Sequence, residues 1–236
     1  MAESTRVNTG RGALAVYNLE DEAENRLNAL LSIKPRRTMS GIEWHDEANN
    51  RSYQRIIGGL AWPSAESLTP LSSIAILGED KEVDVATGQQ KIWILYEDSA
   101  MTIEDLLDTA VVRMEQIVCS DWIIPMHEPE YVRVERWSRE RKKRRMPVPH
   151  FCAPPSHDFV QLNALMQART VSNKSFYFGK ESPAATLYVA IPDADFNRSL
   201  GKYPAVAAVL YPLGYLDMTQ KRGIRRSNYV PAQGGY

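Results

Sequence analysis

The sequence predicts an α/β protein in which a mixed β-sheet is flanked by helices on both faces, with an arm at each end of the chain. Three apolar segments typical of strands follow one another: SYQRIIGGLAW at 52–62, LSSIAILGE at 71–79 and KIWILYE at 91–97. Helix-like and strand-like segments alternate after them. Consecutive strands usually pair antiparallel, whereas strands separated by a helix pair parallel. The predicted sheet is therefore of mixed direction and is covered on both faces.

The composition is that of an ordinary globular protein, with 44% hydrophobic and 24% charged residues among 236. A formal net charge of -1 excludes a uniformly basic nucleic-acid binder but not a local basic patch. No apolar run is long enough to span a membrane and no secretory signal opens the chain, so neither a membrane partner nor secretion is expected. The four histidines are scattered, and Cys119 and Cys152 lie outside any CxxC motif, so no structural zinc site is expected.

Residues 1–50 are predicted to form an N-terminal arm and one helix. Asn18 suits the N-cap of a helix over about 19–33, whose apolar residues fall on one stripe. The segment 34–52 is predicted to be a loop, with a short ordered piece around Ile42 and Trp44.

Residues 51–218 are predicted to form the main domain, and its best-defined helix begins after Thr102. Thr102 is a good N-cap, acidic residues follow it in the first turn, and apolar residues recur at helical spacing from Ile103 to Ile117. CSDWIIPM at 119–126 is typical of a short buried strand. EPEYVRVERWSRERKKRR at 128–145 indicates a helix with a basic end.

The remaining elements continue the alternation. We expect a strand in VPHFCAPP at 148–155, a helix in SHDFVQLNALMQART at 156–170, and strands in SFYFGK at 175–180 and TLYVAI at 186–191. An apolar helix, YPAVAAVLYPLGYL at 203–216, closes the domain and is expected to be interrupted at Pro212. Residues 219–236 are predicted to form a basic C-terminal tail.

This order of elements is the skeleton of an RNase H-like domain, and residues 53–216 resemble the nuclease domain of tailed-phage large terminase subunits. In that family a first strand ends in Gly-x-Asp, and a Pro-containing loop leads to a second strand. IIGGLAWPSAESLTPLSSIAIL at 56–77 has this layout. The later segments resemble the family in order, and GKYPAVAAVLYPLGY stands at its last Gly-x-Asp-Asp-like turn and helix. No GxxxxGK[ST] phosphate loop occurs, so no ATPase half is expected in this chain.

The resemblance implies two-metal phosphodiester hydrolysis, in which about three convergent carboxylates hold two Mg²⁺ or Mn²⁺ ions. Asp121 matches the aspartate that ends the family's fourth strand. Ala61 stands at the first-strand aspartate, and Tyr203 and Pro204 stand at the final pair, so these positions provide no carboxylate. The resemblance therefore implies a degenerate metal site, whether Ala61 is native or engineered.

An active site would have to be rebuilt from other carboxylates. If the protein is active, we expect Asp121 and Glu97 to be catalytic and Asp121, Asp193 and Asp195 to bind metal, with Asp217 as a further candidate. Carboxylates at strand ends and in turns are also common as caps, so this alternative stays open. The cofactor is Mg²⁺ or Mn²⁺ if the site is active and none if it is degenerate.

The most strongly charged segment of the chain is RWSRERKKRR at 136–145. It is predicted to contact a nucleic-acid backbone or an acidic partner, with Trp137 able to stack. The predicted contact residues are Arg139, Arg141, Lys142, Lys143, Arg144 and Arg145. The alternative is a solvated helix end whose cations suit the helix dipole. The basic tail is as suited to docking on a neighbouring subunit as to binding nucleic acid.

These features predict a phage- or virus-related protein that acts in DNA packaging or virion assembly by binding DNA or other protein subunits in an oligomer. Its expected location is the cytoplasm of an infected host cell or the virion. Two alternatives stay open: an active two-metal-dependent endonuclease of the terminase type, and a purely structural virion protein whose likeness to terminases is accidental. Two further carboxylates close to Asp121 would favour the endonuclease.

Overall fold

The computed structural model describes most of the predicted main domain and parts of the N-terminal segment. The residues described are 6–9, 12–17, 32–39, 41–85, 87–117, 119, 121–126, 130–154, 158–173, 175–179, 182–192, 195 and 200–221. Most of the helix predicted at 19–33, the tail beyond residue 221, Asp193, His127 and His157 lie outside these residues. Among the described helices, none is long and apolar enough to cross a membrane.

In the described part of the chain, ten strands form one sheet in the order β1-β2-β10-β7-β6-β5-β4-β3, with β8 beside β5 and β9 beside β8. β4 pairs with residues 51–53 of β5 and β8 with residues 57–59, so both border the same edge of β5 at different heights. The bounds are β1 Arg6–Thr9, β2 Gly12–Tyr17, β3 Ile33–Thr38, β4 Gly41–Asp46, β5 Arg51–Ala61, β6 Ser72–Asp84, β7 Gln89–Ala100, β8 Asp121–Ile123, β9 Phe151–Cys152 and β10 Phe176–Gly179.

Five of these strands have the topology of an RNase H-like domain. β5, β6 and β7 are consecutive antiparallel strands, in which Gly59 pairs with Ala75 and Ala75 with Glu97. β8 runs parallel to β5, with Asp121 beside Ile57, and β9 runs parallel to β8. The spatial order of the five is third, second, first, fourth and fifth, and a helix precedes both β8 and β9. The RNase H-like α/β fold predicted from the sequence is confirmed.

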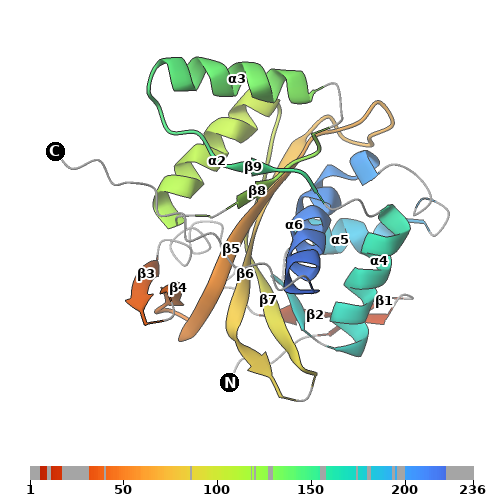
Figure 1. Ribbon diagram of the computed structural model, residues 1–236. Coiled ribbons are helices and arrows are strands. Elements are labelled where there is room, and N and C mark those ends of the chain that lie inside the picture. Colours follow the sequence, from red (N-terminus) through yellow and green to blue (C-terminus); the bar gives the residue numbers. More distant parts are fainter. Residues whose placement is uncertain are drawn as a thin grey trace.

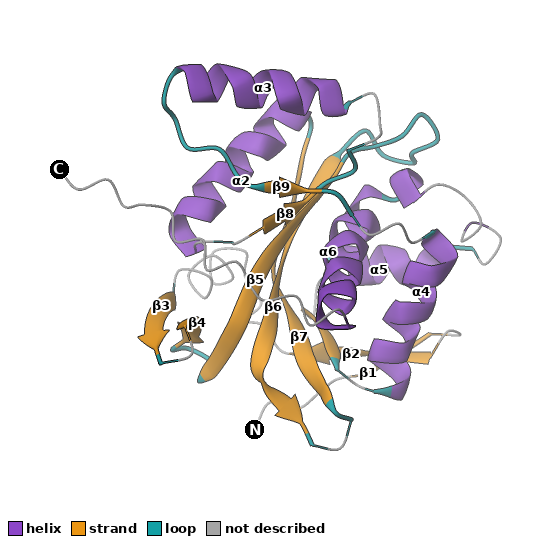
Figure 2. Ribbon diagram, in the orientation of Figure 1, coloured by secondary structure: helices purple, strands orange, loops and turns teal. Residues whose placement is uncertain are grey.

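Helices cover both faces of the sheet, with α2 and α3 on one face and α4, α5 and α6 on the other (Figures 1 and 2). Each face has its own apolar core, to which α2 contributes Leu106 and Leu107 and α6 contributes Val206 and Leu210. The helix bounds are α2 Ile103–Ile117, α3 Tyr131–Lys143, α4 Phe159–Gln167, α5 Pro183–Ala190 and α6 Pro204–Lys221. A π-helical turn, η1 Ala168–Ser172, follows α4, and a 3-10 turn, η3 Leu200–Lys202, precedes α6.

Side-chain caps define where several helices begin. The hydroxyl oxygen of Thr102 accepts a hydrogen bond from the backbone N–H of Asp105 at 3.1 Å, so the cap predicted for α2 is present. Asp158 and Gln161 form a reciprocal capping box at α4. These contacts satisfy backbone donors that the first turn of a helix leaves free.

α6 lies against Gly59 of β5 at a distance that no side chain would permit. A Cβ atom at Gly59 would lie 2.0 Å from the carbonyl oxygen of Ala208 and 2.7 Å from Cδ of Pro212. Pro212 has no N–H to donate to the carbonyl of Ala208 four residues earlier. Glycine leaves room for this carbonyl and for the proline ring. α6 continues through Pro212, so the expected interruption of the helix was wrong.

Other segments also differ from the sequence-based prediction. Residues 33–38 and 41–46 form the β3–β4 hairpin where a loop was predicted. Most side chains of β3 are exposed, so this strand has no apolar pattern in the sequence. Residues 6–9 and 12–17 of the predicted arm form β1 and β2, and β2 joins the sheet beside β10. TLYVAI lies largely in helix α5, because Ser182 caps the helix and Pro183 occupies its first turn. The strand predicted there was wrong.

Candidate functional site

At the end of β5, where the resemblance places its first carboxylate, the structure has a closed apolar core. Ala61 and Tyr203 are 1% and 2% exposed and belong to one cluster with Phe159. The loop after β5 is joined to the start of α6, because the N–H of Ser64 donates to the carbonyl oxygen of Gly201 at 3.0 Å. Apolar side chains fill this end of the sheet.

Asp195 is held by two side chains at the start of α6. Its Oδ2 accepts a hydrogen bond from Lys202 Nζ at 2.6 Å and another from the Tyr203 hydroxyl. Burial and the neighbouring Asp195 carboxylate raise the pKa of Tyr203, so its hydroxyl keeps the proton that it donates. The carboxylate of Asp195 therefore has an ammonium group and a hydroxyl as its partners.

Glu97 and Asp217 also have structural partners. Glu97 Oε1 accepts a hydrogen bond from the backbone N–H of Ala184 at 3.1 Å, in the first turn of α5. The helix dipole favours a carboxylate at this position. Asp217 Oδ1 lies 3.7 Å from Nη2 of Arg169, whose side chain is buried. The carboxylate of Glu97 thus caps the first turn of α5, and that of Asp217 pairs with a buried cation.

Asp121 is the first residue of β8 and lies far from Ala61 in the sheet. It pairs with Ile57, four residues before Ala61 on β5, which separates the two positions by about 13 Å along the strand. Glu97 lies on β7, three strand spacings or about 14 Å from β8. Asp195 lies with Tyr203 at the start of α6. The described carboxylates that the sequence suggested for a rebuilt site are thus dispersed.

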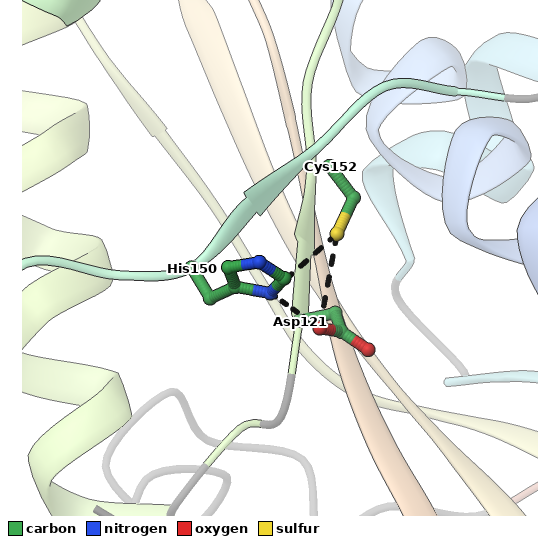
Figure 3. Close-up of side chains that lie close together, drawn as sticks. All are labelled: Asp121, His150 and Cys152. Carbon is green, nitrogen blue, oxygen red and sulfur yellow. Dashed lines mark hydrogen bonds and ion pairs between the residues drawn. The ribbon is translucent and has the colours of Figure 1, made fainter. Parts of the chain in front are cut away.

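Asp121 instead meets His150 and Cys152, as Figure 3 shows. The Nδ1 atom of His150 lies 2.8 Å from Oδ1 of Asp121, and Sγ of Cys152 lies 3.7 Å from this oxygen and 3.6 Å from this nitrogen. Within the described residues, this group brings three possible metal-ligating atoms within 4.8 Å of one another. These three residues could hold a metal ion.

The pairing of β9 with β8 positions this group. The N–H of Trp122 donates to the carbonyl oxygen of His150 at 2.9 Å, and the N–H of Ile124 donates to that of Cys152 at 3.0 Å. Because side chains alternate along an extended chain, His150 and Cys152 point to one face, where Asp121 lies. The side chains of His150 and Asp121 are 68% and 26% exposed, so solvent reaches the group.

Charge and burial keep the cysteine protonated in the absence of a cation. Burial, with the neighbouring Asp121 carboxylate, raises the pKa of Cys152 to about 11. Burial also raises the pKa of Tyr215, which lies on α6 and hydrogen-bonds the Cys152 thiol, to about 12, with Asp121 and Cys152 adding to the effect. A thiol with a raised pKa is a poor nucleophile.

The basic residues predicted to contact nucleic acid lie at the end of α3 and just after it. Three of them form ion pairs within 4 Å: Arg139 with Glu135, Arg141 with Asp108 and Lys143 with Glu140. For Lys142, Arg144 and Arg145, the described residues include no ion-pair partner within that distance. Arg141 also covers Trp137, with its guanidinium carbon 4.9 Å from the ring centroid. The segment is exposed and its positive charge is only partly neutralised.

No protein-family model and no curated protein sequence matches the chain. Among solved structures, the chain is similar to the large terminase nuclease from thermophilic phage G20c, which was crystallised with bound zinc. The match covers 81% of this chain and 95% of that chain, with 11% sequence identity and a TM-score of 0.43. At this level of similarity, no residue role, metal or activity is transferred from that protein.

Proposed function

We propose that this protein is a phage- or virus-related RNase H-like protein that lacks the two-metal site of terminase nucleases and acts in DNA packaging or virion assembly by binding DNA. The observation that carries the proposal is the closed core around Ala61 and Tyr203. Two-metal cleavage requires carboxylates that converge on ions about 3.5–4 Å apart. Asp121, Glu97 and Asp195 are dispersed, and each has a partner of another kind.

The basic end of α3 supports DNA binding as the mode of action. Residues 131–145 contain eight Lys or Arg and two Glu, whereas the whole chain has a net charge of -1. α3 buries Val134 and presents most of its other side chains to solvent. A concentrated and exposed patch of positive charge attracts the phosphate backbone without reading its sequence. The packaging role itself rests on the resemblance of residues 53–216 to terminase nucleases.

Cleavage of supercoiled plasmid in Mn²⁺ tests the loss of the catalytic site. We expect no nicking by the unaltered chain or by Ala61→Asp, because Tyr203 and Pro204 still provide no carboxylate. Ala61→Asn is the matched control, with the same size and no charge. Circular dichroism checks that both variants fold, since a polar group at this buried position is destabilising.

Cleavage by the unaltered chain would contradict the proposal and favour the active endonuclease. Cleavage by Ala61→Asp and not by Ala61→Asn would show that the missing carboxylate at residue 61 is what prevents cleavage. Other carboxylates would then complete the metal site.

Fluorescence anisotropy with duplex DNA over a range of salt concentrations tests the binding surface. For each protein we plot the logarithm of the DNA association constant against the logarithm of the salt concentration. The double variant Lys142→Ala/Arg144→Ala is expected to make the slope of this plot less steep by about one for each phosphate that the protein no longer neutralises. Lys81→Ala/Lys91→Ala is the matched control, because it removes the same charge from lysines paired with Glu43 and Asp84. An equal reduction of the slope in both double variants, or no binding of the unaltered chain to DNA at low salt, would favour a role through protein partners.

A further inference from the structure

Possible ligand atoms of Asp121, His150 and Cys152 lie close together, and two of their three separations are near the ligand spacing of a small metal ion. In a tetrahedral zinc site with bonds of about 2.0–2.3 Å, the ligand atoms lie about 3.3–3.6 Å apart. The two distances from Cys152 Sγ, 3.6 Å and 3.7 Å, are close to this spacing. The third distance, 2.8 Å between Asp121 and His150, has to open by about 0.6 Å when two metal bonds replace the hydrogen bond.

The geometry differs from that of a cysteine nucleophile activated by histidine. In such a catalytic triad, the nucleophile and the carboxylate bind opposite nitrogens of the imidazole, so that a proton passes through the ring. Here the carboxylate of Asp121 and the thiol of Cys152 both approach Nδ1 of His150. Three atoms that meet at a common point suit a cation and not a proton relay.

The identity of the three ligands selects the class of metal. A thiolate with an imidazole suits zinc and similar first-row transition metals, whereas Mg²⁺ and Mn²⁺ prefer sites built from oxygen. Three protein ligands leave a fourth tetrahedral position, and the exposed His150 side chain leaves the site accessible from solvent.

Neighbouring groups support the ligands. Tyr215 hydrogen-bonds the Cys152 thiol from α6. The thiol of Cys119 donates to the backbone carbonyl oxygen of Asp121 at 3.4 Å. Outer contacts of this kind orient the ligands of metal sites.

We propose that Asp121, His150 and Cys152 bind one Zn²⁺ ion through Oδ1, Nδ1 and Sγ, with the fourth position open to solvent. When the zinc–sulfur bond forms, the thiol proton leaves to solvent, and the ion joins β8 to β9 at the edge of the sheet. The site is separate from the two-metal position at Ala61 and does not depend on the proposed DNA-binding role.

Titration of the metal-free full-length chain with Co²⁺ tests the site. Co²⁺ replaces zinc spectroscopically, and we expect one equivalent to produce visible bands of tetrahedral cobalt together with a near-ultraviolet thiolate-to-cobalt band. Zn²⁺ should displace the Co²⁺. Cys152→Ser should abolish the thiolate band. Cys152→Ser and His150→Gln should each weaken Zn²⁺ binding by at least about tenfold. Tenfold is the lower bound because loss of a group that only orients a ligand already weakens metal binding by about that factor.

The chain offers a matched control for the histidine variant. His45→Gln makes the same substitution outside the group and should leave the metal stoichiometry and the thiolate band unchanged. Near-ultraviolet circular dichroism establishes that every variant is folded. A thiolate band that survives Cys152→Ser, Zn²⁺ affinity that is the same in all variants, or no bound metal in the unaltered chain would overturn the proposal.

Discussion

The two ends of the sheet face that α6 covers differ in what fills them. At the start of α6, the rings of Phe159 and Tyr203 lie 6.4 Å apart in the apolar cluster to which Ala61 also belongs. Toward the end of α6, Arg55 donates through Nε to Glu79 and through Nη1 to the hydroxyl of Thr219, both at 2.7 Å. The group of Asp121, His150 and Cys152 lies on this second side, where Asp121 is beside Ile57. The first end is packed with apolar side chains beside the buried carboxylate of Asp195, whereas the second also carries polar side chains that solvent reaches.

This difference shows that chemistry in an RNase H-like frame is set by side chains and not by topology. Both ends are bordered by the same parallel strands and the same helix. The family resemblance directs attention to the ends of β5 and β8, whereas the convergent polar atoms lie at the beginning of β8. A search guided by topology alone would miss them.

The largest expected effect tests whether the closed end depends on the close contact between α6 and β5. Gly59→Ala places a Cβ atom 2.0 Å from the carbonyl oxygen of Ala208, so α6 has to move. We expect a loss of about 3 kcal/mol or more in the free energy of unfolding, measured by urea denaturation. Gly88→Ala is the control: no atom lies within 4 Å there, and its positive φ of 66° costs about 1 kcal/mol. Equal losses in the two variants would mean that the contact is not restrictive.

A smaller effect is expected for the hydroxyl of Tyr203. Tyr203→Phe keeps the ring and removes the hydrogen bond to the buried carboxylate of Asp195. A hydrogen bond to a charged group contributes about 1.5–3 kcal/mol, so urea denaturation should detect a loss in this range. Tyr131→Phe, at a half-buried position on α3, should change stability by less than about 0.5 kcal/mol. An unchanged free energy of unfolding in Tyr203→Phe would mean that Lys202 alone is a sufficient partner for the Asp195 carboxylate.

The smallest effect concerns the polar end and appears only at high pH. The folded-state pKa of Tyr215 is raised to about 12, above its ordinary value of 10.0. The unfolded chain therefore loses this proton first, and the stabilisation present below pH 10.0 is lost as the pH rises toward about 12. Tyr215→Phe should make the stability less dependent on pH in this range, measured by urea denaturation at several pH values. The same dependence of stability on pH in the unaltered chain and in Tyr215→Phe would contradict the prediction.

The sequence predicts the core strands from their continuous apolar runs, and α2 from its periodic apolar face and its cap at Thr102. It also predicts the general position of α3, although this helix buries only Val134. It does not predict the β3–β4 hairpin, since exposed strands owe their structure to a partner. It also does not reveal which residue of CSDWIIPM enters the sheet first. That register decides whether Asp121 stands at the beginning or the end of β8.

The group of Asp121, His150 and Cys152 also could not be predicted from the sequence. The spacing of His150 and Cys152 is visible in the sequence and places both on one face of an extended segment. Their meeting with Asp121 depends on the hydrogen bonds between β8 and β9, which join residues about thirty positions apart. No local pattern around Asp121 contains this information.

The contact between Gly59 and Ala208 also sets the position of α6 along the sheet face that it covers. From Ala208 back to Tyr203 the helix rises about 7.5 Å, and from Gly59 forward to Ala61 the strand extends about 6.6 Å. The near equality brings the start of α6 level with the end of β5. Sliding α6 along β5 would carry the Ala208 carbonyl toward Ile57 or Ala61, the next residues on this face of the strand, and both have side chains. A single carbonyl seated on a single glycine thus fixes which side chains of α6 can face which positions of the sheet.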